Sequence, residues 1–199
     1  MNFLDLEKLP AQLRSIATHQ TLESGEHLFH QSDPTHSIFM LQSGAIRVLR
    51  YGNDGQEIDY YRVYAGEFFA EVALFDEVHL CSAIAEEQTQ VITFPKSEFW
   101  SALRQDFTLS NAFMEQMAHR LHRTKVMLEV RGMRSTRERI LHYLRYLTDS
   151  NGGTVQLDRP LKSISQELGV SPESLSRILK QLELENIITR TKRTIVLHE

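Results

Sequence analysis

The sequence predicts an α+β protein with a β-rich N-terminal domain, one long helix and a small helix-turn-helix domain at its C-terminal end. Three patterns support this prediction. Short β-rich runs separated by turn signals fill residues 21–99, and apolar side chains repeat every three and four residues over 107–131. Two short amphipathic helices with a tight turn between them then follow Leu161. A chain of 199 residues has room for two small domains of this kind.

The composition is that of a folded protein. Hydrophobic residues make up 41% of the chain and charged residues 24%, which excludes long disordered segments. No apolar run approaches the ~18 residues of a membrane span, and Asp5 and Glu7 stand where a secretory signal would be positive. The sequence therefore predicts a cytoplasmic protein with no membrane association. The single Cys81 excludes a disulfide framework, a multi-cysteine zinc site and a cysteine-ligated iron–sulfur cluster.

The net charge of −4 hides an asymmetry between the two ends of the chain. Residues 132–199 hold 11 Lys and Arg against 8 Asp and Glu, a charge of +3. Residues 1–131 hold 11 against 18, a charge of −7. The contrast predicts two domains, of which the second has an anionic partner. We expect one domain over 1–105, a connecting helix over 106–131 and a second domain over 132–199.

The N-terminal part changes from a helical to a β pattern. Residues 3–17 predict a short helix with apolar side chains on one face. Beyond it, turn signals recur about every ten residues, which is typical of an all-β sandwich or barrel. The strongest is Asn53-Asp54-Gly55, because a tight hairpin turn needs the positive φ that Asn and Gly tolerate.

The long helix carries a heptad seam, whose positions recur in steps of three and four from Phe107 to Arg131 and are mostly apolar. Such a seam predicts a homodimer. The off-seam residues Phe113, Val126 and Met127 are available to pack on the β-rich domain. Gly132 then marks a hinge or boundary. The predicted dimer contacts are Met114, Met117, Leu121, Thr124 and Leu128.

The C-terminal part begins with Ser135, a plausible N-cap for a helix whose inner face is apolar. Asn151-Gly152-Gly153 predicts a turn, and residues 155–157 a short strand. Gly169-Val170 predicts the tight turn of a helix-turn-helix. Ser171 can cap the second helix, and Pro172 suits its first position, where no N–H is needed.

The second helix of this pair has one polar and one apolar face. Glu173 and Arg177 lie one turn apart on the polar face, where they can also pair with each other. In a major groove, Glu can accept from cytosine N4 and Arg can donate two hydrogen bonds to guanine. An ordinary solvated helix pair looks similar, but the basic turn 190–193 between two β runs favours a winged DNA reader. The predicted DNA-binding residues are Ser171, Glu173, Ser174, Ser176, Arg177, Lys180, Lys192 and Arg193.

The whole chain resembles the Crp/Fnr family of bacterial transcription regulators. The matching segments are Ser37–Leu49, Gly55–Ile58 and Gly66–Glu77 in the β-rich part, Gln116–Leu121 in the long helix and Ile164–Ile188 in the helix-turn-helix. The resemblance implies a β-roll like a cyclic-nucleotide-binding jelly roll, with a small-molecule effector pocket. It also implies a homodimer along the long helix, double-stranded DNA with a palindromic operator, and RNA polymerase as a partner. Half-sites would lie about 34 Å apart.

The effector pocket departs from the cyclic-AMP branch of the family. That branch holds the ribose and the cyclic phosphate with Gly-Glu and a later Arg-Ser, whereas this chain has Ala70-Glu71 and Cys81-Ser82. A phosphate at Cys81 would lose a bidentate, charge-assisted contact. The resemblance therefore implies a regulator that does not depend on cyclic AMP, unless Arg62 or Arg123 supplies the charge. The candidate pocket residues are Tyr61, Arg62, Ala70, Glu71, Cys81, Ser82, Thr124 and Lys125.

Other effectors stay open at this point. His79 and Cys81 are two candidate axial ligands for a haem-based gas sensor, and Cys81 is a candidate redox switch. The alternative is that His79 lies exposed on a hairpin and Cys81 fills a small apolar space. A regulator that is active without any ligand is a further alternative.

The second helix also departs from the cyclic-AMP branch. Its run Glu173–Arg177 has the form E-x-x-S-R, which resembles the Fnr-type branch and implies a TTGAT-like half-site. Two other function classes compete with a DNA-binding regulator. A sensing module acting on another protein would have a membrane span or a catalytic domain in place of the helix-turn-helix. An enzyme finds no support, because a Gly-rich phosphate loop, HExxH and a nucleophile elbow are missing from the sequence.

Overall fold

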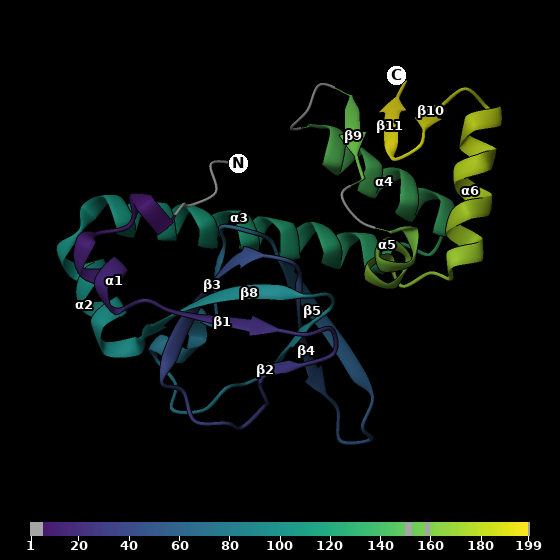
Figure 1. Ribbon diagram of the computed structural model, residues 1–199. Helices are drawn as coiled ribbons and strands as arrows, with labels where there is room; N and C mark the ends of the chain where they lie inside the picture. Colours follow the sequence, from purple (N-terminus) through teal and green to yellow (C-terminus); the bar gives the residue numbers. More distant parts are fainter. Residues whose placement is uncertain (1–5, 150–152, 158–159, 199) are drawn as a thin grey trace. The chain divides into compact units, whose positions relative to one another are not determined.

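The computed structural model in Figure 1 describes residues 6–149, 153–157 and 160–198. It divides into two compact units, Met1–His119 and Arg120–Glu199, and the division falls within the long helix. Each unit is described by itself. The predicted α+β class, with its β-roll, long helix and winged helix-turn-helix, is confirmed.

The N-terminal helix is shorter than predicted. In place of one helix over 3–17, the structure has a 3₁₀ turn, η1 (Leu6–Lys8), and a short helix, α1 (Ala11–Ile16). Pro10 separates them with an extended ψ of 139°, because its ring removes the N–H that a continuous helix would need. Residues 3–5 of the prediction lie outside the described residues.

The β-roll consists of two four-stranded antiparallel sheets, with strand orders β1-β8-β3-β6 and β2-β7-β4-β5. The β pattern therefore begins slightly before the predicted residue 21. The predicted turn at 53–55 joins β4 to β5, with Gly55 at φ +78°. The elements are β1 (Thr18–Leu22), β2 (His27–Phe29), β3 (Ser37–Ser43), β4 (Ile46–Tyr51), β5 (Glu57–Val63), β6 (Phe68–Phe69), the 3₁₀ helix η2 (Glu71–Leu74), β7 (Ser82–Ala85) and β8 (Thr89–Pro95).

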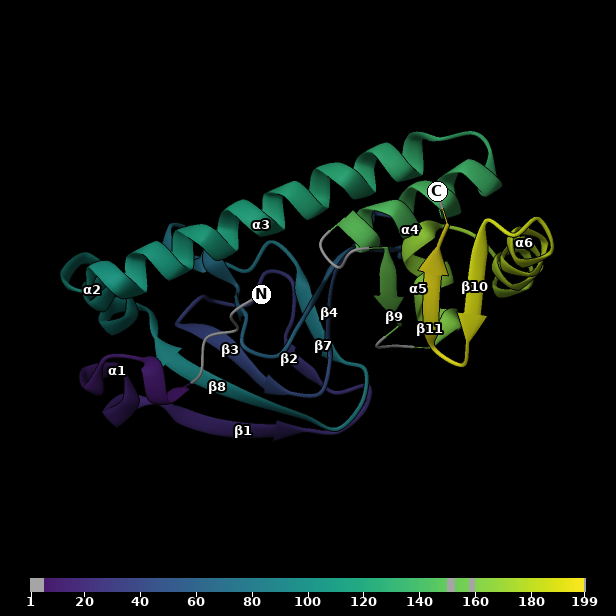
Figure 2. The same ribbon diagram turned by 90° about the horizontal axis from the view of Figure 1, so that it is seen from above.

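Helix α2 (Lys96–Gln105) follows the roll, and α3 (Phe107–Gly132) confirms the predicted long helix. Figures 1 and 2 show α1 and α2 together at the end of the roll where α3 begins. The core beneath them is aromatic: Phe68 and Phe99 meet edge to face at 5.0 Å between ring centroids, and Phe99 meets Phe113 at 5.7 Å. The prediction that Phe113 packs on the β-rich domain is therefore confirmed.

A second contact fixes α3 to the roll through the backbone of β6. The side-chain amide of Gln116 accepts from Phe68 N at 2.9 Å and donates to Phe68 O at 2.6 Å. Because β6 is the last strand of its sheet, these two bonds satisfy backbone groups that no further strand pairs with.

The prediction for Val126 and Met127 is wrong. Both pack in the core of the second unit rather than on the β-roll, because the last turns of α3 lie against the elements that follow it. That core also contains Ile140 and Leu144 of α4, as the predicted inner face requires. Ser135 caps α4 as predicted: Glu138 N donates to Ser135 Oγ at 3.3 Å.

The second unit combines helices with a three-stranded antiparallel sheet of order β10-β11-β9, whose strands Figure 2 shows side by side. Strand β9 confirms the short strand predicted over 155–157, shifted by one residue. Asn151 and Gly152 of the predicted turn lie outside the described residues. The elements are α4 (Thr136–Asp149), β9 (Thr154–Gln156), α5 (Leu161–Leu168), α6 (Pro172–Leu184), β10 (Ile188–Thr191) and β11 (Thr194–Leu197).

Within the described ranges, none of the helices is both long enough and apolar enough to span a bilayer.

Candidate nucleic-acid interface and effector pocket

The turn between α5 and α6 is built as the sequence predicts. Helix α5 ends at Gly169 with φ +63°, a left-handed conformation that glycine adopts without steric cost. Its N–H donates to Gln166 O at 3.1 Å, and Val170 N donates to Ser165 O at 2.9 Å. Ser171 then caps α6, because its Oγ accepts from Ser174 N at 3.1 Å.

The apolar side of α6 faces the core of the second unit and its polar side faces outward. The exposed candidate DNA-binding residues on and next to α6 are Ser171, Glu173, Ser176, Arg177 and Lys180. Ser174 is half-buried, and its hydroxyl accepts from Ser171 Oγ at 3.1 Å. The buried residues on the other side are Leu175, Ile178, Leu179 and Leu182.

The polar face has three exposed charged residues, and two of them, Glu173 and Arg177, lie one helical turn apart. Glu173 and Arg177 make no ion pair with each other or with any other described residue, so the pairing allowed by their spacing is absent. Glu173 also lies in the first turn of α6, where the helix dipole favours a carboxylate. Both side chains are therefore available to a ligand that approaches this face.

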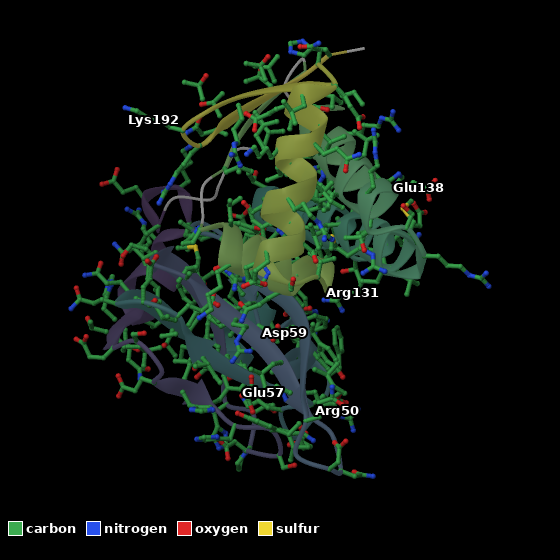
Figure 3. All side chains as sticks on the ribbon, turned by 90° about the vertical axis from the view of Figure 1, so that its right-hand side faces the viewer. Arg50, Glu57, Asp59, Arg131, Glu138 and Lys192 are labelled. Atoms are coloured by element: carbon green, nitrogen blue, oxygen red, sulfur yellow. The ribbon has the colours of Figure 1, made fainter. Side chains whose placement is uncertain are left out.

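Strands β10 and β11 form the predicted wing, with Lys192 and Arg193 in its turn. Both side chains are exposed, and Lys192 has φ +55°. Figure 3 shows Lys192 at the free end of the hairpin, with its side chain directed away from the ribbon. Arg190 belongs to the strand rather than to the turn, and its guanidinium lies 3.5 Å from the carboxylate of Glu183 on α6. This ion pair links the wing to the second helix.

The charge asymmetry is larger when it is counted over the two structural units. Residues 120–199 hold 15 Lys and Arg against 9 Asp and Glu, a charge of +6. Residues 1–119 hold 7 against 17, a charge of −10. The unit with the helix-turn-helix is therefore the one that attracts a polyanion.

The dimer seam on α3 exposes large apolar side chains that a single chain leaves uncovered. Met114 is 58% exposed, Leu121 56% and Leu128 74%, and Phe107 at the start of the helix is 79% exposed. Met117 is half-buried and Thr124 is exposed. Isolated exposed apolar residues are common, but a row of them at heptad spacing marks an interaction face.

Four of the candidate pocket residues of the first unit lie at η2 and the start of β7, and the other two, Tyr61 and Arg62, lie on β5. Ala70, with φ +62°, precedes η2 and directs the chain into Glu71. Burial, followed by the nearby Glu71 carboxylate, raises the pKa of the Cys81 thiol to about 11. Cys81 is therefore a neutral thiol at pH 7 and supplies no positive charge. It packs against the apolar core of the roll, as does Tyr61.

The other pocket candidates hold the roll together or lie in the second unit. Ser82 is fully buried, and its Oγ accepts from Gln31 N at 2.9 Å. The Arg62 guanidinium donates to Glu86 at 2.5 Å. Thr124 and Lys125 are exposed residues of the second unit, and the Thr124 hydroxyl donates to Arg120 O at 2.8 Å.

His79 lies inside the β-roll, so the expectation that it is exposed on a hairpin is wrong. It is 7% exposed, and its ring stacks on Phe29 at 3.7 Å between centroids, with 11° between the planes. Burial lowers its pKa. The histidine is therefore neutral and held by aromatic packing. In the part of the chain that the structure describes, no cluster of three or more His, Cys, Asp or Glu has metal-binding geometry.

Comparisons with known proteins agree with both units. The family model of the cyclic nucleotide-binding domain matches residues 19–106, and that of the Crp-like helix-turn-helix domain matches residues 138–199. The "Cyclic AMP receptor protein" of Thermus thermophilus is 25% identical over 177 residues, 88% of this chain and 81% of that protein. The "cAMP-activated global transcriptional regulator CRP" of Pasteurella multocida is 27% identical over 180 residues, 86% and 85% of the two chains.

Among solved structures, FixK2 from Bradyrhizobium japonicum has the same fold, with a TM-score of 0.70 at 22% identity. The match covers 92% of this chain and 93% of that one. The relatives are transcriptional regulators and not enzymes, in agreement with the lack of catalytic motifs in the sequence.

Proposed function

The two domain matches and the relatives support a transcriptional regulator of the Crp/Fnr family, and on this premise we propose that the chain binds DNA sequence-specifically as a homodimer. The observation that carries the proposal is the outward face of α6, where Glu173 and Arg177 are exposed and without partners among the described residues. The domains proposed are 1–105 for sensing, 106–131 for dimerisation and 132–199 for DNA binding.

The chemistry of this face suits a major groove. Arg177 can donate two hydrogen bonds to guanine O6 and N7, and Glu173 can accept from cytosine N4 of the same pair. Ser176 lies next to Arg177 and can contact a thymine. The E-x-x-S-R form favours a TTGAT-like half-site. Lys192 and Arg193 on the wing would contact phosphates, which set position and not sequence.

In the proposed dimer, the exposed seam residues of α3 would pack against the same residues of α3 in a second chain. Two-fold symmetry then presents two α6 helices to one face of the duplex, and the operator becomes palindromic, with half-site centres about 34 Å apart. Such a dimer would act in the cytoplasm, beside RNA polymerase at the promoter.

The site is tested by selecting duplexes from a random pool with the purified protein. We expect the pool to converge on an inverted repeat of a five- or six-base half-site. A pool that stays unselected while the protein still retains DNA would overturn the proposal, because it would mean binding through phosphates alone.

The wing makes a separate prediction. Replacing Lys192 and Arg193 together by Ala should weaken operator and unrelated DNA by the same factor. Each lost phosphate contact lowers the slope of log K against log salt by about one, so a dimer should lose about two to four units. The measurement is a fluorescence anisotropy titration at several salt concentrations on both duplexes. A loss confined to the operator would mean that the wing reads bases.

We also propose that cyclic AMP is not the effector. The family's phosphate-binding arginine is replaced by Cys81, whose thiol is neutral at pH 7, and Arg62 already pairs with Glu86. The protein would then respond to an effector of another kind or act without an effector. The pKa of the thiol also argues against Cys81 as a fast redox switch, because the thiolate is the reactive form.

Cyclic AMP should leave the thermal unfolding midpoint of the protein unchanged. The concentration to test is about 1 mM, roughly the highest that a specific effector would need. A ligand that binds only the folded state must raise that midpoint. Differential scanning fluorimetry checks this, with Cys81→Arg as the matched variant because it restores the family's residue. A rise that grows with concentration in the unmodified protein would refute the argument from Cys81.

A further inference from the structure

One guanidinium holds three backbone carbonyls of the second unit. Arg139, in the first turn of α4, donates from Nη1 to Leu168 O and to Gly169 O, each at 3.2 Å. From Nη2 it donates to Met133 O at 2.7 Å. These acceptors are 29, 30 and 6 residues away along the chain, so a single side chain joins separate segments.

The carbonyls at Leu168 and Gly169 are those that need a donor. The last carbonyls of a helix have no partner within it, and Gly169 turns the chain away from the axis of α5 in a left-handed conformation. A cation at this end also meets the negative end of the helix dipole. Three residues after Gly169, α6 begins at Pro172. Arg139 therefore bonds the peptide groups that lie directly before α6, the helix proposed to contact the bases and called the reading helix below.

The third acceptor, Met133 O, belongs to the segment between α3 and α4. Met133 directly follows α3, which ends at Gly132, and its N–H donates to Val130 O at 3.2 Å. The end of the dimer helix, α4 and the helix-turn-helix turn thus meet at one planar group. Arg131 adds a second link between the end of α3 and α5, with Nε donating to Glu167 O at 3.2 Å.

The Arg139 guanidinium bonds backbone carbonyls and not a carboxylate of the described residues. Among the described residues, no carboxylate lies within 4.0 Å of its guanidinium, and its buried Nε–H finds no acceptor. The residue is half-buried, and an unsatisfied buried N–H is costly, so an ordinary packing role would be filled more cheaply by an apolar side chain. Arginine is suited here because its planar fork reaches acceptors in two directions, whereas lysine carries its donors on one atom.

From these contacts we infer that Arg139 is a positioning residue that sets the direction of α6 relative to the end of α3. In a dimer, that direction fixes how far apart the two reading helices lie and therefore which spacing between half-sites is accepted. The inference rests on the proposed DNA-binding function. It assigns to Arg139 the selectivity for operator spacing, while Glu173 and Arg177 are proposed to read the bases.

The test varies operator spacing with each half-site unchanged. One added base pair moves a half-site by about 3.4 Å and turns it by about 34°. The duplexes carry the operator selected by the unmodified protein, with its spacer shortened by one, unchanged, or lengthened by one or two base pairs. Affinities are measured for the unmodified protein, Arg139→Lys and the matched control Arg145→Lys. Arg145 is an exposed residue of the same helix with no side-chain bond to a described residue.

We expect the unmodified protein and Arg145→Lys to prefer the native spacing by about 30-fold or more. Arg139→Lys should bind the native operator about tenfold more weakly and the altered spacings almost unchanged, so that its preference falls about tenfold. Binding to a duplex with one half-site should stay within about threefold of the unmodified protein. A general loss of structure would instead reduce binding to every duplex alike.

The remaining outcomes would refute either the positioning role of Arg139 or the proposed DNA-binding function. A folded Arg139→Lys that keeps the full spacing preference refutes the positioning role. If this variant has lost its helical circular dichroism at 10 °C, Arg139→Gln is measured in the same way, and a full preference there refutes the role equally. Equal losses on one half-site and on the whole operator also refute it. If the unmodified protein selects no operator, the proposed DNA-binding function fails before any variant is compared.

Discussion

Replacing Arg177 by Ala should reduce affinity for the selected operator by at least about 30-fold while leaving binding to unrelated DNA nearly unchanged. The bidentate contact between arginine and guanine discriminates by about 1–3 kcal/mol. A dimer loses it twice, so the combined loss is about 2–6 kcal/mol on the operator. Unrelated DNA is held mainly through phosphates, which the wing contacts remain free to make. Competitive gel-shift titration on both duplexes measures the two losses separately.

The fold should not change in this variant, because Arg177 is exposed and contributes nothing to the apolar face of α6. Arg145→Ala serves as the control, since it removes the same charge from an exposed position outside the helix-turn-helix. Equal losses in Arg177→Ala and Arg145→Ala would point to a general electrostatic effect. Undiminished selectivity in Arg177→Ala would mean that another surface reads the sequence.

Introducing charge into the α3 seam should abolish the dimer. Leu121→Glu places two carboxylates at facing positions where the proposed dimer buries apolar side chains, and each would lose its hydration without a partner. Leu121 is 56% exposed in the single chain, so the isolated unit should tolerate the change. Sedimentation equilibrium should give a mass near 23.1 kDa for the variant and twice that value for the unmodified protein. Operator affinity should fall at least 100-fold at nanomolar protein.

His119→Glu is the matched control for the seam. It adds the same side chain to an exposed position of α3 that lies opposite the heptad seam. The control should remain dimeric and bind the operator normally. A dimeric Leu121→Glu would move the interface away from α3 and would leave the row of exposed leucines and methionines without an explanation.

Elements with strong local patterns were predictable from the sequence, whereas contacts between distant backbone groups were not. The α3 seam and the amphipathic α6 follow from residue spacing. The turn between α5 and α6 follows from Gly169, which accepts a positive φ, and from Ser171, which caps α6. The N-terminal helix was overestimated because apolar spacing outweighed the break at Pro10. The prediction for Val126 and Met127 was wrong for another reason. Their heptad positions show that they lie off the seam, but not which domain they pack against.

Two functional features had no sequence signal. Arg139 holds carbonyl oxygens, and every residue offers a carbonyl, so no residue type marks its acceptors. The burial of His79 was not predictable from its neighbours in the sequence, because its ring partners Phe29 and Phe39 come from strands about 40 to 50 residues earlier. For the polar face of α6 the reverse holds, because helical periodicity alone separates its exposed from its buried residues.

The amide of Gln116 has a consequence for how copies of this chain can associate. An unpaired outer strand is a template for pairing with another molecule, and short strands with covered backbone are the usual protection. At β6 the carboxamide occupies the positions that a neighbouring strand would use, bonding both backbone groups of Phe68. The helix that carries the exposed apolar row therefore also covers the β6 edge of the roll, so the proposed dimer would form through side chains on α3 and not by extension of the sheet at β6.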